Sequence, residues 1–440
     1  MQDGLSSPAV TQEPDAAPSF GEALRTWTRI GILSFGGPTA QIALMHKVVV
    51  EEKKWLTEHQ YLNALSFCML LPGPEAMQLA TYAGWRLHGL AGALSAGLLF
   101  VLPGAAVMLA LSIIYAGFGN VPIVEALFFG IKAAVLVIVV EALLRIAKRA
   151  LIRPEHWAIA AASFVAIFFL GWPFPLIIAI AGGIGFVRGY HLSGTISVPR
   201  PTVSLWDTLR VVLCWLAVWV APLAMLAAIF GVGHVLAQLG WFFSKLAVVT
   251  FGGAYAVLTY MGQDVVLRHG WLEAGQMMDG LGLAETTPGP LILVTQFVGY
   301  LAAYRHGGDP AVVMGLLGTF VALWATFVPC FLWILVGAPY LEWITAQAGL
   351  RGALTAITAA VVGVILNLAV WFALHVFFGH VASVEIGPLK LSVPELASLD
   401  WRVVVLAGLS GYLLLRRHYG IATVLAVTSA LSLAMRLGGL

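Results

Sequence analysis

The sequence has few charged residues and no paired cysteines. Asp, Glu, Lys and Arg make up 10% of the 440 residues and hydrophobic residues 60%, against about 25% charged in soluble domains. Cys68, Cys214 and Cys330 stand singly in apolar segments, which argues against a disulfide scaffold or a cysteine metal site. A net charge of +2 provides no basic field for nucleic acid. Long apolar stretches instead recur at the length that crosses a lipid bilayer.

Motifs for catalysis and for cofactors are also missing. The sequence contains no His-Glu-x-x-His, Walker or Gly-x-Ser-x-Gly pattern, so no enzymatic activity, cofactor or metal is expected. Without an ATP site, any pumping must use an ion gradient or the membrane potential. Residues 1–19 lack the basic start and apolar core of a signal peptide, and a disordered N-terminal tail is predicted there.

What the sequence does contain is a duplication. Ser34-Phe35-Gly36-Gly37 returns as Thr250-Phe251-Gly252-Gly253, and Pro72-Gly73-Pro74 returns as Pro288-Gly289-Pro290, both 216 residues later. Trp55 also returns as Trp271 at this offset. Repeats of Trp, Pro and Gly in one ungapped register are hard to obtain by chance in an apolar sequence. In a membrane protein, apolar segments that are interrupted at matching places in two halves indicate a secondary transporter.

Hydropathy predicts six membrane spans in each half and one span between them. The first repeat, 20–190, has expected spans at 22–47, 58–88, 90–117, 122–145, 156–171 and 173–188. The second repeat, 235–440, has them at 236–261, 274–303, 311–337, 349–376, 401–415 and 419–436. The linker 191–234 holds an apolar run at 205–231 that has no partner in the repeat.

The unpaired span sets the expected orientation of the halves. Six crossings return the chain to its starting side, so a seventh starts the second half on the opposite face. The fold class predicted is therefore an all-α polytopic membrane protein with two inverted repeats and about 13 spans. Basic loops such as 145–153 place the N-terminus in the cytoplasm. Segments 58–88 and 274–303 are either broken crossings or re-entrant hairpins.

The Gly-Gly and Pro-Gly-Pro motifs are predicted to interrupt helices within the membrane. Adjacent glycines weaken a helix, and Pro38 suits the first turn of a new one. A helix that restarts presents free N–H groups and the positive end of its dipole, which together form an anion site. Four such ends that converge would bind an anion. The alternative is that these residues only allow close helix packing.

Basic residues at matching places in the halves are candidates for the same site. Arg29 and Lys245 share the 216-residue offset, and Lys132 matches Arg351 in later spans. Charged residues inside spans are costly and are functional candidates by default. The alternative is a side chain that reaches the interface from a span end, and we interpret Arg25 and Arg145 in this way.

Three acids within the predicted spans, Glu75, Glu141 and Glu285, lack an acidic partner at the repeat offset, which suits a proton carrier. The predicted substrate-binding residues are Arg29, Phe35, Gly36, Gly37, Pro38, Pro72, Gly73, Pro74, Gln78, Lys132, Lys245, Phe251, Gly252, Gly253, Pro288, Gly289, Pro290 and Arg351.

These motifs resemble those of the chromate ion transporter (CHR) family. The resemblance runs from about Phe20 to Leu437. It is carried by Phe35-Gly36-Gly37-Pro38, Leu71-Pro72-Gly73-Pro74 with Gln78, Leu102-Pro103-Gly104, Thr250-Phe251-Gly252-Gly253 and Thr287-Pro288-Gly289-Pro290. Ala254 stands where the first half has Pro38, so the break in the second half departs from the first.

The resemblance implies a two-repeat carrier that exports chromate across the bacterial inner membrane and confers chromate resistance. Sulfate or another oxyanion is an alternative substrate, because sulfate has the shape and charge of chromate. A gated anion channel is an alternative mechanism, and an intramembrane enzyme is a third class. The expected partners are chromate and the lipid bilayer, with a homodimer as a candidate assembly and no nucleic acid.

Overall fold

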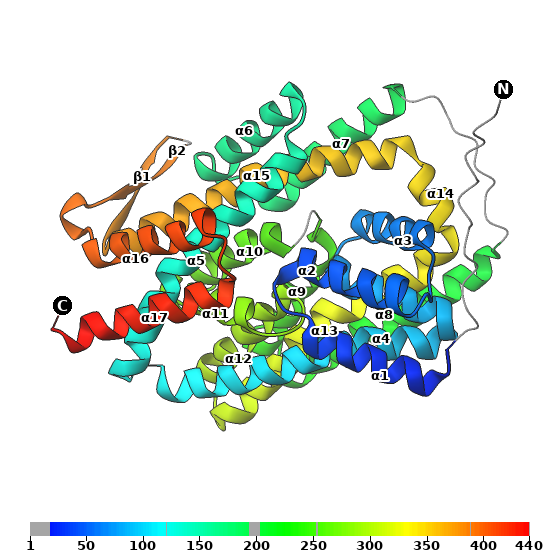
Figure 1. Ribbon diagram of the computed structural model, residues 1–440, viewed down its shortest axis with the longest axis horizontal. Helices are drawn as coiled ribbons and strands as arrows, with labels where there is room; N and C mark the ends of the chain where they lie inside the picture. Colours follow the sequence, from blue (N-terminus) through cyan, green and yellow to red (C-terminus); the bar gives the residue numbers. More distant parts are fainter. Residues whose placement is uncertain (1–17, 120, 193–202, 252–253, 388, 440) are drawn as a thin grey trace, which may run out of the picture.

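The computed structural model describes residues 18–119, 121–192, 203–251, 254–387 and 389–439; most of the predicted N-terminal tail, Gly252 and Gly253 lie outside them. The described chain is almost entirely helical (Figure 1). In the first half, the helices are α1 (Phe20–Leu33), α2 (Gly37–His46), η1 (Lys47–Glu52), α3 (Glu58–Leu70), α4 (Glu75–Phe118), α5 (Pro122–Ala150), α6 (Pro154–Phe168) and α7 (Phe174–Leu192).

The helix α8 (Leu205–Phe230) separates this half from a second series in similar order. That series comprises α9 (Val235–Val249), α10 (Ala254–Gln263), η2 (Asp264–Arg268), α11 (Ala274–Thr286), η3 (Leu291–Leu293), α12 (Val294–His306), α13 (Ala311–Gly337), η4 (Ala338–Tyr340), α14 (Leu341–Ala346), α15 (Ala348–Phe377), α16 (Trp401–Gly411), η6 (Tyr412–Arg416) and α17 (Ile421–Leu437). A β-hairpin of β1 (Val381–Ile386) and β2 (Leu389–Pro394), followed by η5 (Leu396–Ser398), precedes α16.

Matching local signals start matching helices in the two halves. A capping box between Thr57 and Gln60 begins α3, and one between Glu273 and Gln276 begins α11, at the same 216-residue offset. In each box the two side chains satisfy backbone N–H groups that have no partner within the helix. The helices before these boxes also end alike, because both η1 and η2 are π-helical.

The predicted helix breaks are present where residues are described. Helix α1 ends at Leu33, and α2 begins at Gly37 with Pro38 in its first turn. Gly36 and Gly37 have φ angles of +86° and +76°, which residues with a Cβ rarely adopt. In the second half, α9 ends at Val249 and α10 begins at Ala254.

At these breaks the chain turns back instead of continuing across. Arg29 on α1 forms an ion pair with Glu52 at 3.2 Å, although 23 residues separate them; a continuous helix would place them about 35 Å apart. In the second half, Phe242 on α9 contacts His269 just after η2, with ring centroids 5.4 Å apart. The expectation that 22–47 and 236–261 are single broken crossings is therefore wrong. Both are helical hairpins.

The Pro-Gly-Pro segments form hairpins as well, which decides the alternative that the sequence left open. The rings of Phe67 on α3 and Tyr82 on α4 lie 6.3 Å apart across the first turn. Arg305 on α12 donates to Gln276 on α11 at 2.7 Å across the second. The two arms of each hairpin lie side by side, so the chain leaves the hairpin at the end where it entered.

Six described helices are long and apolar enough to cross a membrane: α4, α5, α7, α8, α13 continuing into α14, and α15. Helix α4 changes direction at His88 and Gly89, whose backbone is not helical. Its first part belongs to the Pro-Gly-Pro hairpin and its second part is a separate crossing. The chain is thus a polytopic membrane protein.

Helix α15 packs against α5, α6 and α7, and α6, α7 and α15 run along the upper side of the molecule in Figure 1. The segment 377–400, which lies between two of the predicted spans, contains the β-hairpin. Its Lys390 N–H donates to the carbonyl of Phe169, between α6 and α7, at 2.8 Å. The alternation in Leu389–Pro394 is short and weakly apolar, and hydropathy therefore gave no sign of these strands.

Candidate functional site

The four hairpins meet in the interior, where backbone hydrogen bonds connect the two halves. The N–H of Gly73 donates to the carbonyl of Thr250 at 2.8 Å, and the N–H of Gly289 donates to the carbonyl of Ser34 at 2.8 Å. Each Pro-Gly-Pro tip of one half therefore binds the residue that ends the first hairpin helix of the other half, Thr250 after α9 or Ser34 after α1. Gln41 Nε2 adds a donor to the carbonyl of Gly289 at 2.6 Å. Buried backbone groups at these turns find partners across the two halves.

Beside these tips lies a cavity of about 430 Å³. Three helix beginnings line it: Gly37 and Pro38 of α2, Glu75 of α4, and Ala254 of α10. Gly73 of the first Pro-Gly-Pro tip lines it too. A water molecule occupies about 30 Å³, so the cavity holds an anion of a few heavy atoms together with several waters.

The positive end of each lining helix gives the cavity an anion-attracting potential. The first N–H groups of a helix have no intrahelical acceptor and carry the equivalent of roughly half a positive charge. Helices α2 and α10 are each 10 residues long and start at the cavity. Three such ends, from both halves, converge on one space.

Two arginines of α5, Arg145 and Arg149, complete the lining. Arg145 forms an ion pair with Glu141 one turn earlier, and its side chain is 40% exposed. Tyr255 at the start of α10 also lines the cavity and donates its hydroxyl to Glu285 at 2.7 Å. Glu285 is buried. The site thus holds guanidinium groups beside carboxylates that are already hydrogen-bonded.

The predicted site residues divide between this cavity and other places. Gly36, Gly37, Pro38, Gly73 and Glu75 line the cavity. Pro72 accepts from Gln78 Nε2 at 2.6 Å, directly behind the Pro-Gly-Pro tip. Pro74 and Pro290 flank the two tip glycines, and Gly289, after Pro288, makes the contact to Ser34. Phe35 is 49% exposed. Phe251 is the last described residue before Gly252 and Gly253, which lie outside the described residues.

The paired basic residues lie away from the described cavity lining. Arg29 is 55% exposed and pairs with Glu52. Lys245 lies over the ring of Tyr260, 5.4 Å from its centroid. Arg351 donates to the carbonyl of Ala346 at 3.4 Å, at the start of α15.

Lys132 belongs to a separate buried cluster. Its Nζ lies 3.5 Å from Asp279 on α11, whose side chain is 3% exposed. The same carboxylate oxygen accepts from the hydroxyl of Tyr115 at 2.7 Å. Lys132 lies in the first half of α5, whereas Arg145 and Arg149 lie near its last residues.

Sequence reasoning missed Arg145, Arg149, Tyr255 and Asp279 as site residues. One signal for Arg145 was available: Glu141 precedes it by four residues, which places both on one helix face. Asp279 had no comparable signal, because its partners come from α4 and α5.

Interrupted helices whose ends face a cavity inside a polytopic bundle define a membrane transport protein. The sequence profile of the chromate transporter family matches residues 21–186 and 237–435, and the chain belongs to this family. It is 31% identical over 418 residues to a chromate transport protein of Pseudomonas aeruginosa, covering 92% of this chain and 95% of that protein.

Two further relatives have a similar sequence identity to this chain. A chromate transport protein of Cupriavidus metallidurans is 29% identical over 360 residues, which cover 78% of this chain and 80% of that protein. An uncharacterised transporter of Methanocaldococcus jannaschii is 28% identical over 363 residues, covering 82% and 86%. No solved structure matches the chain.

Proposed function

We propose that the protein is a secondary transporter that exports chromate from the bacterial cytoplasm through the inner membrane. The observation that carries this proposal is the cavity where the starts of α2, α4 and α10 meet Arg145 and Arg149. Helix N-termini and guanidinium groups are the donors that suit a tetrahedral dianion. A carrier rather than a channel is favoured because the tips are hydrogen-bonded across the two halves.

The arrangement in the membrane follows from the hairpins. We assign four re-entrant hairpins, which do not cross, and nine crossings: the second part of α4, α5, α6, α7, α8, α13, α15, α16 with η6, and α17. Four crossings in the first half plus α8 make an odd number, so the two halves are inverted. Nine crossings replace the 13 spans predicted from the sequence, while the two repeats keep the inverted orientation that the sequence predicts.

Loop charges support a cytoplasmic N-terminus for this arrangement. The loop after α5, the end of α7 and the turn before α17 carry Arg149, Arg153, Arg188, Arg416 and Arg417, and all fall on one side. Lys47, Lys53 and Lys54, at the open end of the first hairpin, join them. The cavity arginines at the end of α5 then lie toward the cytoplasm, which suits loading for export.

The buried cluster of Lys132, Asp279 and Tyr115 lies toward the opposite side. Lys132 on α5 and the buried Asp279 on α11 form an ion pair at 3.5 Å, and this contact resists separation of the two helices. We assign it as the closure that separates before the anion leaves.

Energy for export is available from the membrane potential. A dianion that leaves a cell with a negative interior gains about 4.6 kcal/mol at 100 mV, equivalent to roughly three orders of magnitude in concentration. Glu75, Glu141 and Glu285 are the proposed proton-coupling groups, because Glu75 lines the cavity and the other two bind cavity residues.

The test is uptake of labelled chromate and sulfate into inside-out membrane vesicles, with and without a pH gradient. A carrier gives saturable uptake that is accelerated by substrate on the far side, whereas a channel gives flux without such acceleration. Competition by sulfate decides whether the site selects chromate or divalent tetrahedral anions in general. Wild-type vesicles that accumulate no more label than vesicles without the protein would refute transport.

The inverted arrangement predicts that Gly117 and Lys148, at opposite ends of two consecutive crossings, lie on opposite faces of the membrane. An added Cβ at Gly117 meets nothing within 4 Å, and Lys148 is exposed, so cysteines are tolerated at both. We expect Gly117→Cys to react with an impermeant maleimide in intact cells and Lys148→Cys only in inside-out vesicles. Cys214, the exposed native cysteine, is first replaced by Ala. Labelling of both positions from the same side would contradict the inversion.

We further propose that Arg29 and Lys245 line the anion path in the outward-facing conformation. Their hairpins carry the breaks, and an ion pair that is 55% exposed on its Arg29 side is weak enough to exchange for a substrate. Arg29→Gln and Lys245→Gln should each lower the apparent affinity about tenfold. Arg25→Gln, one turn earlier on the same helix face, is the control. Unchanged affinity in both variants would remove these residues from the path.

A further inference from the structure

A second, larger cavity of about 780 Å³ lies at the ends of α6, α7 and α15. Its charged lining residues are Arg153, Arg188, Arg351 and Glu155, which leaves two uncompensated positive charges. It also shares three lining residues, Ile152, His156 and Thr355, with the cavity at the hairpin tips. The two cavities therefore adjoin, and we call the larger one the vestibule.

Small residues place the vestibule arginines on their helices. Gly185 and Gly189 on α7 face Ala348 and Gly352 on α15, where an added Cβ at Gly352 would lie 2.3 Å from the carbonyl oxygen of Gly185. Small residues four positions apart let two membrane helices approach closely. Arg188 and Arg351 are held close to this helix crossing, because Arg188 directly precedes Gly189 and Arg351 directly precedes Gly352 in the sequence.

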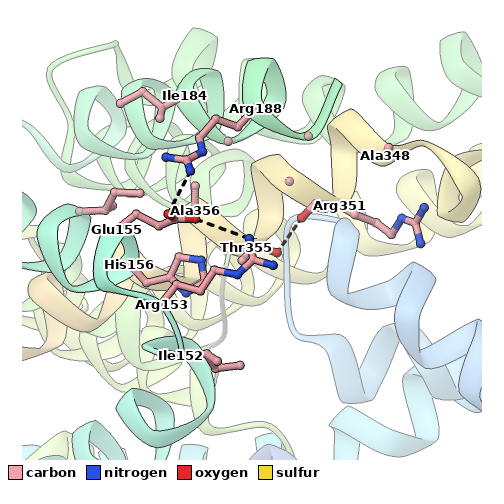
Figure 2. Close-up of a pocket in the computed structure, with 14 residues that line it drawn as sticks. Ile152, Arg153, Glu155, His156, Ile184, Arg188, Ala348, Arg351, Thr355 and Ala356 are labelled. Carbon is pink, nitrogen blue, oxygen red and sulfur yellow. Dashed lines mark hydrogen bonds and ion pairs between the residues drawn. The ribbon is translucent and has the colours of Figure 1, made fainter. Parts of the chain in front are cut away.

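Figure 2 shows Arg153 and Arg188 reaching the carboxylate of Glu155 from two sides. Arg188 Nη2 lies 2.9 Å from one carboxylate oxygen and Arg153 Nη1 lies 3.6 Å from the other. The guanidinium of Arg351 points away from this pair (Figure 2). Two guanidiniums thus already hold an oxygen-bearing anion, which is supplied by the protein itself.

We propose that Arg153 and Arg188 form an entrance site where a tetrahedral oxyanion displaces Glu155 before it moves to the cavity at the hairpin tips. A guanidinium binds two oxygens of such an anion at once, and a dianion attracts both groups more strongly than one carboxylate does. The side chains of Arg153 and Arg188 are 64% and 52% exposed, so the site loads from solution. This inference rests on the proposed function and identifies the first binding site of the transported anion.

The same chemistry is offered by the transported oxyanion and by the phosphate of an anionic lipid. Contiguity with the inner cavity favours the transported anion. The test therefore measures chromate uptake into proteoliposomes of phosphatidylcholine alone and of phosphatidylcholine with phosphatidylglycerol, for the wild type, Arg188→Gln and Glu155→Gln. Arg436→Gln is the matched control, because Arg436 pairs with Glu125 at the same 2.9 Å and is 45% exposed, close to the 52% of Arg188.

The two variants should change the KM in opposite directions. We expect Arg188→Gln to raise the KM for chromate about tenfold and Glu155→Gln to lower it severalfold, in both lipid mixtures, with little change in maximal rate. Added salt should raise the KM of the wild type more than that of Arg188→Gln. Arg436→Gln should behave as the wild type.

Equal KM values and salt responses in the wild type and Arg188→Gln would overturn the entrance site while leaving transport itself established. An effect confined to vesicles with phosphatidylglycerol would also overturn it, since the arginines would then hold a lipid. Failure of the proposed function is distinct, because the wild type would then show no uptake in either mixture.

Discussion

Replacing Arg145 by Gln should weaken chromate binding by ten- to a hundredfold, the loss expected for one charge-assisted contact of about 1.5–3 kcal/mol. Arg145 lines the cavity at the hairpin tips, and among the described residues its ion pair is with Glu141 on its own helix. That arrangement allows the guanidinium to turn toward an anion without breaking a contact between helices. Arg145→Lys should recover part of the loss, because an ammonium group cannot bind two oxygens in a plane. The measurement is the concentration dependence of chromate uptake at matched protein levels.

Removal of Arg145 also leaves Glu141 without its partner, and a control must separate these effects. In the double variant Arg145→Gln with Glu141→Gln, affinity should stay low if the lost guanidinium is the cause. Arg268→Gln removes a comparable pair, since Arg268 bonds Asp264 four residues earlier at 3.3 Å, away from the described cavity lining. Wild-type affinity in Arg145→Gln, or an equal loss in Arg268→Gln, would contradict the assignment.

Gly37→Leu should abolish transport while the protein still inserts into the membrane. The φ angle of Gly37 is +76°, which costs a residue with a Cβ on the order of 1–3 kcal/mol. An added Cβ meets nothing within 4 Å, so crowding of the protein is not the problem. The leucine side chain would instead enter the space for the anion and turn the N–H groups at the start of α2 away from it.

Gly270→Leu is a matched control for this substitution. Gly270 has a φ angle of +60° and open space around its Cβ position, and it lies in the turn after η2 rather than at the cavity. We expect Gly270→Leu to lower stability by a similar amount and to keep transport. Expression and thermal stability of both variants are measured beside uptake. Transport by Gly37→Leu at the wild-type rate would show that the start of α2 does not bind the anion.

Sequence alone predicted the helix breaks because they depend on local chemistry. Two adjacent glycines followed by Pro38 cannot continue a helix, and the repeat offset marked the same event near Thr250. The direction of the chain after each break was not predicted. A crossing that continues and one that turns back have the same hydropathy, and only contacts such as that between Arg29 and Glu52 distinguish them.

The site was predicted in part for the same reason. Gly36, Gly37, Gly73 and Glu75 adjoin the breaks and were found from the motifs. Arg145 was set aside because its position near the end of an apolar run resembles that of an interfacial residue. Its place at the cavity depends on how α5 crosses the hairpins, which no local pattern encodes.

We propose that the oxyanion binds where the helix starts of both halves meet Arg145. Electron cryo-microscopy of the reconstituted protein with saturating chromate tests this claim most directly. We predict density for one tetrahedral anion between the start of α2, the start of α10 and Arg145, absent without chromate and displaced by excess sulfate if the site accepts divalent oxyanions generally. Density beside Lys132 and Asp279, with the cavity at the hairpin tips empty, would contradict the account.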